Sequence, residues 1–168
     1  RNPPSSVDVA VMKPFWSAFV LAWVIPVMGF AQTAEAPVDV PSTKIRVYFT
    51  PGHTVETAIA DEIGTAKREI RVQAYSFTNP IIVQALADAK ARGVNVIVVL
   101  DKSNRTQKYS AADFTSNAGI ETLIDDKHAI AHNKVMIIDD QIVITGSYNF
   151  TSAAEKSNAE NLVIIESG

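Results

Sequence analysis

Two patterns of hydrophobic and polar positions alternate along the chain after residue 43. Runs rich in β-branched and aromatic residues predict strands at 44–50, 70–77, 94–100 and 120–124. Apolar residues spaced by three or four predict helices at 54–68 and 79–92, with a shorter helix near 109–117. Asn79 and Pro80 are typical of a helix start, and Gly93 is typical of a helix end. The repeated strand–helix order predicts an α/β fold.

The strand at 94–100 reads "VNVIVVL" and is almost wholly apolar. Such a run is typical of a central strand that is covered on both faces, as in parallel sheets. We therefore expect a mixed, mostly parallel β-sheet flanked by helices on both faces. Ligands usually bind beyond the carboxyl ends of such strands, which makes Asp101–Arg105 a candidate ligand-binding segment.

A different strand pair is predicted between residues 131 and 150, "AHNKVMIIDDQIVITGSYNF". Val135–Ile138 and Ile142–Thr145 are short β-rich runs separated by three polar residues, which predicts a tight hairpin. If the turn centres on Asp140, the numbers of facing residues sum to about 280. Lys134 then lies opposite Gly146 at the open end of the hairpin.

This register gathers polar side chains at one end of the hairpin. His132 and Lys134 share one face of their strand because side chains repeat every two residues. Ser147 and Asn149 reach the same end from the other arm, where Gly146 lets the backbone approach closely. Taken singly, each polar residue could equally be a cap, a turn residue or a solvated side chain. Together, an imidazole, an ammonium, a hydroxyl and an amide suit a phosphate ester.

A helix is predicted just beyond the hairpin. Ser152 to Glu155 matches the S-x-x-E capping box, so we expect this helix to begin at Ser152. Its free N–H groups and the positive end of its dipole would then favour an anion beside the polar cluster. The sequence contains no phosphate-binding P-loop, and no nearby hydroxyl–histidine–carboxylate series indicates a serine hydrolase.

The amino-acid composition excludes several further classes of functional site. The 168 residues are 47% hydrophobic and 20% charged, which is typical of a folded domain with a core. Cysteine is absent, which excludes disulfides, thiolate chemistry and cysteine-based zinc sites. The net charge of −3 argues against a broad cationic surface for nucleic acid, although a small local basic site remains compatible with it.

The N-terminal part predicts a targeting segment. Residues 14–30, "PFWSAFVLAWVIPVMGF", carry no charge and are followed by small residues. We interpret 1–31 as an N-terminal extension with a secretory signal peptide at about 12–31, 32–43 as a linker and 44–168 as the catalytic domain. A periplasmic or secreted location follows from this interpretation, and an uncleaved membrane anchor is the alternative.

The hairpin resembles the HKD signature of the phospholipase D superfamily, H-x-K-x4-D-x6-G-S-x-N, at every fixed position: His132, Lys134, Asp139, Gly146, Ser147 and Asn149. The stretches "VYFTPG", "IRVQAYSFTN", "GVNVIVVLDKSN" and "TSAAEKSNAENLVII" extend the resemblance over most of the chain from residue 44 to residue 166. It is greatest for the small secreted bacterial endonucleases that carry one HKD copy per chain. The resemblance implies a phospholipase D-like fold.

The resemblance also implies a mechanism. His132 would attack phosphorus and form a covalent phosphohistidine, so that one hard displacement becomes two easier ones. Glu160, in the segment "NAEN", would orient the imidazole, as the third member of a triad does. Asp139 would hold the hairpin and its neighbours. Three residues would hold the phosphoryl oxygens: Lys134, Ser147 and Asn149.

With one HKD half-site per chain, the resemblance implies a homodimer in which two copies of His132 meet at a two-fold axis. His128 is a rival for the second histidine, but we interpret it as a substrate contact or a solvated residue. His53 is expected in a surface loop near the site. The scheme requires neither a metal nor another cofactor. Relatives usually continue into a C-terminal helix, which this sequence, ending at Gly168, would lack.

These observations lead to one main hypothesis about function. The chain is expected to be a metal-independent phosphodiesterase, an endonuclease that hydrolyses DNA or RNA. The same chemistry on phospholipid, as a phospholipase D or phosphatidyltransferase, is the first alternative. A catalytically silent, phosphate-binding dimer is the second.

Overall fold

The computed structural model describes residues 42–107 and 110–167. The expected signal peptide and residues 32–41 of the expected linker lie outside the described residues. Seven strands are present in the described part: β1 (Lys44–Phe49), β2 (Glu69–Ala74), β3 (Asn95–Asp101), β4 (Glu121–Asp125), β5 (Lys134–Ile138), β6 (Ile142–Gly146) and β7 (Asn161–Glu166). The helical elements are α1 (Val55–Thr65), α2 (Pro80–Ala91), the 3-10 turn η1 (Lys102–Arg105), α3 (Ala111–Asn117) and α4 (Ser152–Lys156).

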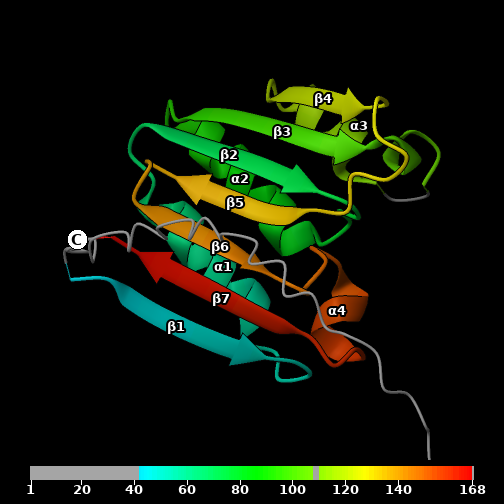
Figure 1. The fold of residues 1–168 in the computed structure, drawn as a ribbon. Coiled ribbons are helices and arrows are strands. Elements are labelled where there is room, and N and C mark those ends of the chain that lie inside the picture. Colours follow the sequence, from blue (N-terminus) through cyan, green and yellow to red (C-terminus); the bar gives the residue numbers. More distant parts are fainter. Residues whose placement is uncertain (1–41, 108–109, 168) are drawn as a thin grey trace, which may run out of the picture. The chain divides into compact units, whose positions relative to one another are not determined.

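The seven strands form one mixed sheet in the order β1-β7-β6-β5-β2-β3-β4 (Figure 1). The predicted mixed α/β sheet is therefore confirmed, but the expectation that it is mostly parallel is wrong. Only β2–β3 and β3–β4 pair in parallel, whereas the other four neighbouring pairs are antiparallel. The reason is that β1, although followed by a helix, pairs with β7 at the far edge, and the hairpin β5–β6 inserts between β7 and β2.

The described helices pack on one face of this sheet (Figure 1). Apolar side chains of α1 and α2 join the inward-facing residues of the strands in a single core, for example Ile59 and Leu86 with Val98 and Met136, all fully buried. The opposite face carries half-buried side chains such as Val99 and Val135. In the described part of the chain, the expectation of helices on both faces is therefore wrong, because an apolar run does not reveal how much of each strand face is covered.

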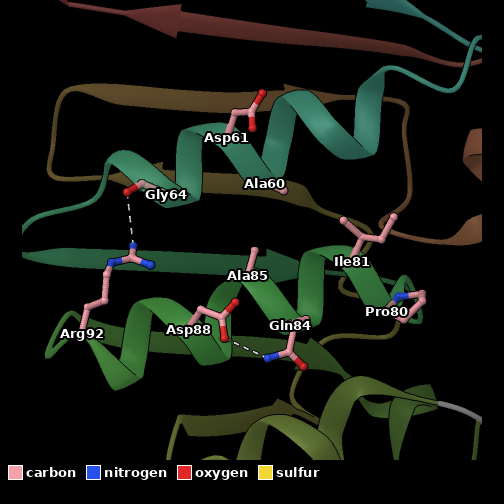
Figure 2. A pocket seen from close by; sticks show the side chains of 9 residues that line it. All are labelled: Ala60, Asp61, Gly64, Pro80, Ile81, Gln84, Ala85, Asp88 and Arg92. Atoms are coloured by element: carbon pink, nitrogen blue, oxygen red, sulfur yellow. Dashed lines mark hydrogen bonds between the residues drawn. The ribbon is translucent and has the colours of Figure 1, made fainter.

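The two long helices are fixed by capping contacts. The Asn79 side chain accepts hydrogen bonds from the backbone N–H groups of Ile81 and Ile82, which confirms the predicted start of α2. At the other end, the Arg92 guanidinium donates to the carbonyl of Ile63 in the last turn of α1, at 3.0 Å. A groove of about 510 Å³ lies between α1 and α2, and no HKD residue lines it (Figure 2).

The hairpin has the predicted register. Val135 faces Thr145 and Ile138 faces Ile142, so facing residue numbers sum to 280. Asp139 and Asp140 form the turn with positive φ angles of 54° and 60°. Short polar residues adopt this left-handed conformation more readily than other side chains do. The open end of the hairpin therefore lies one strand length away from Asp139.

Candidate active site

The site lies at the edge of the sheet where β5 begins. β5 runs antiparallel to β2, so Lys134 pairs with Ala74 and its start lies beside the carboxyl end of β2. The residues before β5 are held by β3, because the Asp101 carboxylate accepts a hydrogen bond of 2.8 Å from the backbone N–H of Ala131. The predicted ligand-binding end of the parallel strands and the open end of the hairpin are therefore the same place.

His132 and Lys134 are in direct contact. The Lys134 Nζ lies 3.1 Å from Nδ1 and 3.2 Å from Nε2 of the His132 ring, and it donates to the His132 carbonyl at 2.9 Å. The ring of Tyr75 lies against the imidazole, with 4.5 Å between centroids, and 5.3 Å from the ammonium. Tyr75 was not among the residues that the sequence singled out; its place directly after a strand next to the hairpin is the signal that could have found it.

The environments of the two HKD residues differ. His132 is exposed, whereas only 7% of Lys134 is exposed. Burial lowers the pKa of Lys134, and the negative charge of Glu160 partly opposes this shift. The result is an ammonium in a poorly solvated position, where its attraction to a phosphoryl oxygen is stronger than in water.

Ser147 and Glu160 form a second cluster at the same edge. The Ser147 hydroxyl donates to Glu160 Oε2 at 2.6 Å and accepts from the backbone N–H of Asn161 at 3.1 Å. The Asn158 amide donates to the other carboxylate oxygen at 3.0 Å. In the described part of the chain, Glu160 therefore bonds these two side chains, not the His132 ring that the resemblance implied as its partner.

Thr50, at the end of β1, fixes the position of Glu160. Its hydroxyl accepts from the Glu160 N–H at 3.1 Å and donates to the carbonyl of Asn158 at 2.9 Å. Its own N–H donates to the Glu160 carbonyl at 3.0 Å. These bonds join the first strand to the segment "NAEN" across more than a hundred residues of sequence, and periodicity alone gave no sign of them.

Gly146 is the last residue of β6, and Asn149 follows it by three residues. Gly146 has a φ of 150°, and a Cβ placed on it would collide with the backbone carbonyl of Asn161 in β7. The predicted close approach of backbone at this glycine is therefore confirmed. The side-chain oxygen of Asn149 is buried and has no hydrogen-bond partner within the described structure. Such an orphaned acceptor is costly unless a donor from a ligand or water reaches it.

The predicted start of the helix at Ser152 is confirmed, but the capping prediction is wrong in two respects. The N-cap of α4 is Thr151, whose side chain accepts from Ala154, so it precedes the predicted cap by one residue. Glu155 does not close a capping box either. Its carboxylate is fully buried and accepts from the backbone N–H groups of Val55 and Glu56 at the start of α1. The S-x-x-E pattern could not show that a tertiary partner would take the glutamate.

Asp139 lies at the turn, at the far end of the hairpin from His132. Its carboxylate accepts hydrogen bonds of 2.7–2.9 Å from the backbone N–H groups of Lys67, Arg68 and Glu69, where the chain enters β2. Burial alone would raise the pKa of Asp139, but these hydrogen bonds and the positive charge of Arg68 hold it below its usual value. This residue of the signature therefore ties the hairpin to β2, as expected, and does not line the site.

The other two histidines lie in loops that follow strands. His53 is exposed with a positive φ of 58°, in the loop that follows Thr50. His128 lies in the loop after β4 and hydrogen-bonds Asp125. Within the described residues, no three histidine, aspartate or glutamate side chains converge in a way that could hold a metal ion. The same described part contains no helix that is long and apolar enough to cross a membrane.

Comparison with known proteins agrees with this geometry. The family described as "Cardiolipin synthase, PLD-like domain" matches residues 59–168. The chain belongs to the phospholipase D superfamily, and the similarities support an enzyme of the phosphodiesterase type. It is 42% identical over 168 residues to a "Phospholipase D" of Rickettsia bellii, a match that covers 89% of this chain and 84% of the relative. A "Phospholipase D" of Rickettsia conorii is 46% identical over 76% of this chain, which spans 64% of that relative.

Two solved structures share the fold. Nuc from Salmonella typhimurium, described as a phospholipase D family member, has a TM-score of 0.72 and 41% identity, covering 75% of this chain and 84% of Nuc. NucT from Helicobacter pylori has a TM-score of 0.67 and 25% identity, covering 74% of this chain and 86% of NucT. The phospholipase D-like fold is thereby confirmed.

Proposed function

We propose that this protein is a metal-independent phosphodiesterase that hydrolyses phosphodiester bonds in DNA or RNA through a covalent phosphohistidine. The observation that carries the proposal is the contact between the exposed His132 imidazole and the buried Lys134 ammonium. This pair places a nucleophile and a phosphate-binding cation at one point. Similarity to Nuc and NucT supports a nucleic acid as the substrate.

The chemistry follows from the groups at the site. A ring nitrogen of His132 attacks phosphorus, the bond from phosphorus to the leaving oxygen breaks, and a general acid protonates that oxygen. Lys134 binds a phosphoryl oxygen while negative charge shifts in the transition state. Water then attacks the phosphohistidine, gives its proton to the general base and restores the free imidazole.

The proposed reaction needs a second group as general acid and base. His128 is held by Asp125 at the end of β4, and His53 lies in the loop after β1. A homodimer would supply His132 of a second copy as the missing group, and each site would then contain one histidine from each chain. The Asn149 oxygen, which lacks a donor among residues 42–107 and 110–167, would accept from a group that enters the completed site.

Phospholipid is the second candidate substrate, and it is supported by the names of several relatives. In addition to the rickettsial proteins named "Phospholipase D", a "Mitochondrial cardiolipin hydrolase" of Canis lupus familiaris is 27% identical over 79% of this chain. Phospholipid and nucleic acid share a phosphodiester group, so His132 and Lys134 would act on either substrate in the same way.

The decisive experiment compares substrates with and without the nucleophile. Wild-type protein in EDTA is expected to nick plasmid DNA or cleave RNA, and His132→Ala is expected to lose at least about a thousandfold in rate. The variant should keep its melting temperature because His132 is exposed. Nicking that EDTA blocks would contradict the metal-free scheme, and choline release from phosphatidylcholine without nicking would favour the lipase. Binding without turnover of either substrate would indicate the silent dimer.

A further inference from the structure

The loop between β4 and β5 carries a histidine that the proposed reaction does not use. His128 Nδ1 lies 2.7 Å from Asp125 Oδ2, and the second oxygen of that carboxylate accepts from the backbone N–H groups of Lys127 and His128 at 3.0 and 3.2 Å. The Asp125 side chain is 12% exposed, whereas that of His128 is 73% exposed. The carboxylate therefore anchors the loop and directs an accessible imidazole outward.

We propose that His128, oriented by Asp125, is a second phosphate-contact site that holds a neighbouring phosphodiester of the strand whose scissile phosphate lies at His132. This inference rests on the proposed nuclease function and adds a substrate subsite to it. The ligand is a polynucleotide, because only a polymer of phosphodiesters presents a second phosphate at a fixed spacing from the first.

Distance along the chain supports this assignment. His128 and His132 belong to one loop and are separated by four residues, so their Cα atoms are at most about 13–14 Å apart. The hydrogen bond from Ala131 to Asp101 fixes the loop between them. A nucleic acid strand carries one phosphate per about 3.4 Å of helix axis. Another phosphate of a strand bound at His132 would therefore lie within a few nucleotides of His128.

The charges around His128 favour an anion. Lys102 Nζ donates to the His128 carbonyl at 3.1 Å, which brings an ammonium from η1 to the same loop. Lys127 is an exposed neighbour. The carboxylate of Asp126 is paired with Arg105 at 3.0 Å, so its negative charge is largely offset. Two other carboxylates lie at this loop: Asp125, which the imidazole engages, and the buried Asp101, which accepts from the backbone N–H groups of Ser103 and Ala131.

The protonation state of the His128 imidazole determines whether it can donate a hydrogen bond to a phosphate oxygen. Asp125 accepts from Nδ1–H, so the neutral imidazole would present a lone pair at Nε2, whereas the imidazolium would present an N–H donor there. A phosphate oxygen needs that donor. Hydrogen bonds from His128 hold the pKa of Asp125 below its usual value, so the carboxylate stays ionised and supports the imidazolium. The phosphate contact therefore requires the imidazolium form of His128, and histidine is the side chain whose charge commonly changes between pH 5 and 8.

The test compares His128→Gln and Asp125→Asn with wild type on two substrates, a single-stranded oligonucleotide and bis(p-nitrophenyl) phosphate, at pH 5.5 and pH 8.5. On the oligonucleotide at pH 5.5, His128→Gln should raise KM about three- to tenfold with kcat unchanged. The slope of log Kd against log salt should fall by about 0.7, the value for one phosphate contact with a single strand. Hydrolysis of the small diester should not change. Lys90→Gln, on α2, is the matched control and should behave as wild type on both substrates.

Each other result has a defined meaning. A fall in kcat on both substrates would overturn the inference, because His128 would then take part in the chemistry. An unchanged oligonucleotide KM at pH 5.5 would overturn it as well, and so would an equal effect at both pH values. If wild-type protein hydrolyses the small diester but neither binds nor cleaves the oligonucleotide, the proposed nuclease function itself fails. Melting temperatures of the two variants separate these outcomes from misfolding.

Discussion

Glu155 connects α4 to the start of α1, and its replacement gives the sharpest test of the scaffold beneath the site. The carboxylate accepts from Val55 N–H at 3.3 Å, from Glu56 N–H at 3.0 Å and from the Tyr148 hydroxyl at 2.9 Å, and Glu155 is fully buried. Burial, together with the negative charge of Glu155, raises the pKa of Tyr148, so the hydroxyl remains a donor. Tyr148 lies between Ser147 and Asn149 in sequence. The hydrogen-bond network of Glu155 therefore fixes the backbone that carries these two residues.

The change Glu155→Ala removes one acceptor and leaves three buried donors. Hydrogen bonds to a charged group each contribute about 1.5–3 kcal/mol, and an unsatisfied buried donor costs about 1–3 kcal/mol. These terms overlap, and water entering the cavity offsets part of the loss. We expect the free energy of unfolding to fall by about 3–5 kcal/mol, a value similar to that for breaking a buried ion pair. For a domain of this size, the melting temperature should fall by roughly 10–20 °C.

Urea denaturation followed by circular dichroism measures this loss directly. Glu155→Gln keeps one acceptor oxygen and should lose only about 1–2 kcal/mol. Glu121→Ala, an exposed glutamate in β4, is the matched control and should stay within about 0.5 kcal/mol of wild type. The reasoning fails if Glu155→Ala unfolds within about 1 kcal/mol of wild type at an unchanged m value, because the network would then contribute little.

Three further predictions concern residues that hold the candidate active site in position. Gly146→Ala should lower the free energy of unfolding by more than about 2 kcal/mol in urea denaturation, since the added Cβ meets the Asn161 carbonyl. The folded-state pKa of Asp139 is lowered, so this residue stabilises the fold above its unfolded pKa of about 3.9, and the contribution is lost as the pH falls through the folded value. Asp139→Asn should therefore cost about 1–2 kcal/mol at pH 7 and show a shallower loss of stability below pH 4 than wild type; parallel curves would contradict this. Thr50→Val should reduce kcat about tenfold through displacement of Glu160, with rescue by Thr50→Ser, and equal activity of the valine and serine variants would refute that role.

The helix α2 and the hairpin β5–β6 were predictable because local interactions define them. Asn79 and Pro80 start α2 through contacts within four residues. The hairpin register follows from the side-chain period of two and the position of the turn, and these alone bring Val135 opposite Thr145. The placement of His132 and Lys134 at one end of the hairpin and of Asp139 at the other is therefore a property of the sequence.

Long-range pairing was decided by the tertiary structure, because no local pattern encodes which distant strand a segment will join. The sequence placed β1 among strand–helix–strand units, but it pairs with β7 at the edge of the sheet, and Thr50 thereby reaches Glu160. Glu155 belonged to a capping pattern and instead bonds α1, a hundred residues away in the chain. Sequence thus identified the candidate side chains, whereas packing determined what holds each of them in position. Buried donors and acceptors must pair with one another, and their partners can lie anywhere in the chain.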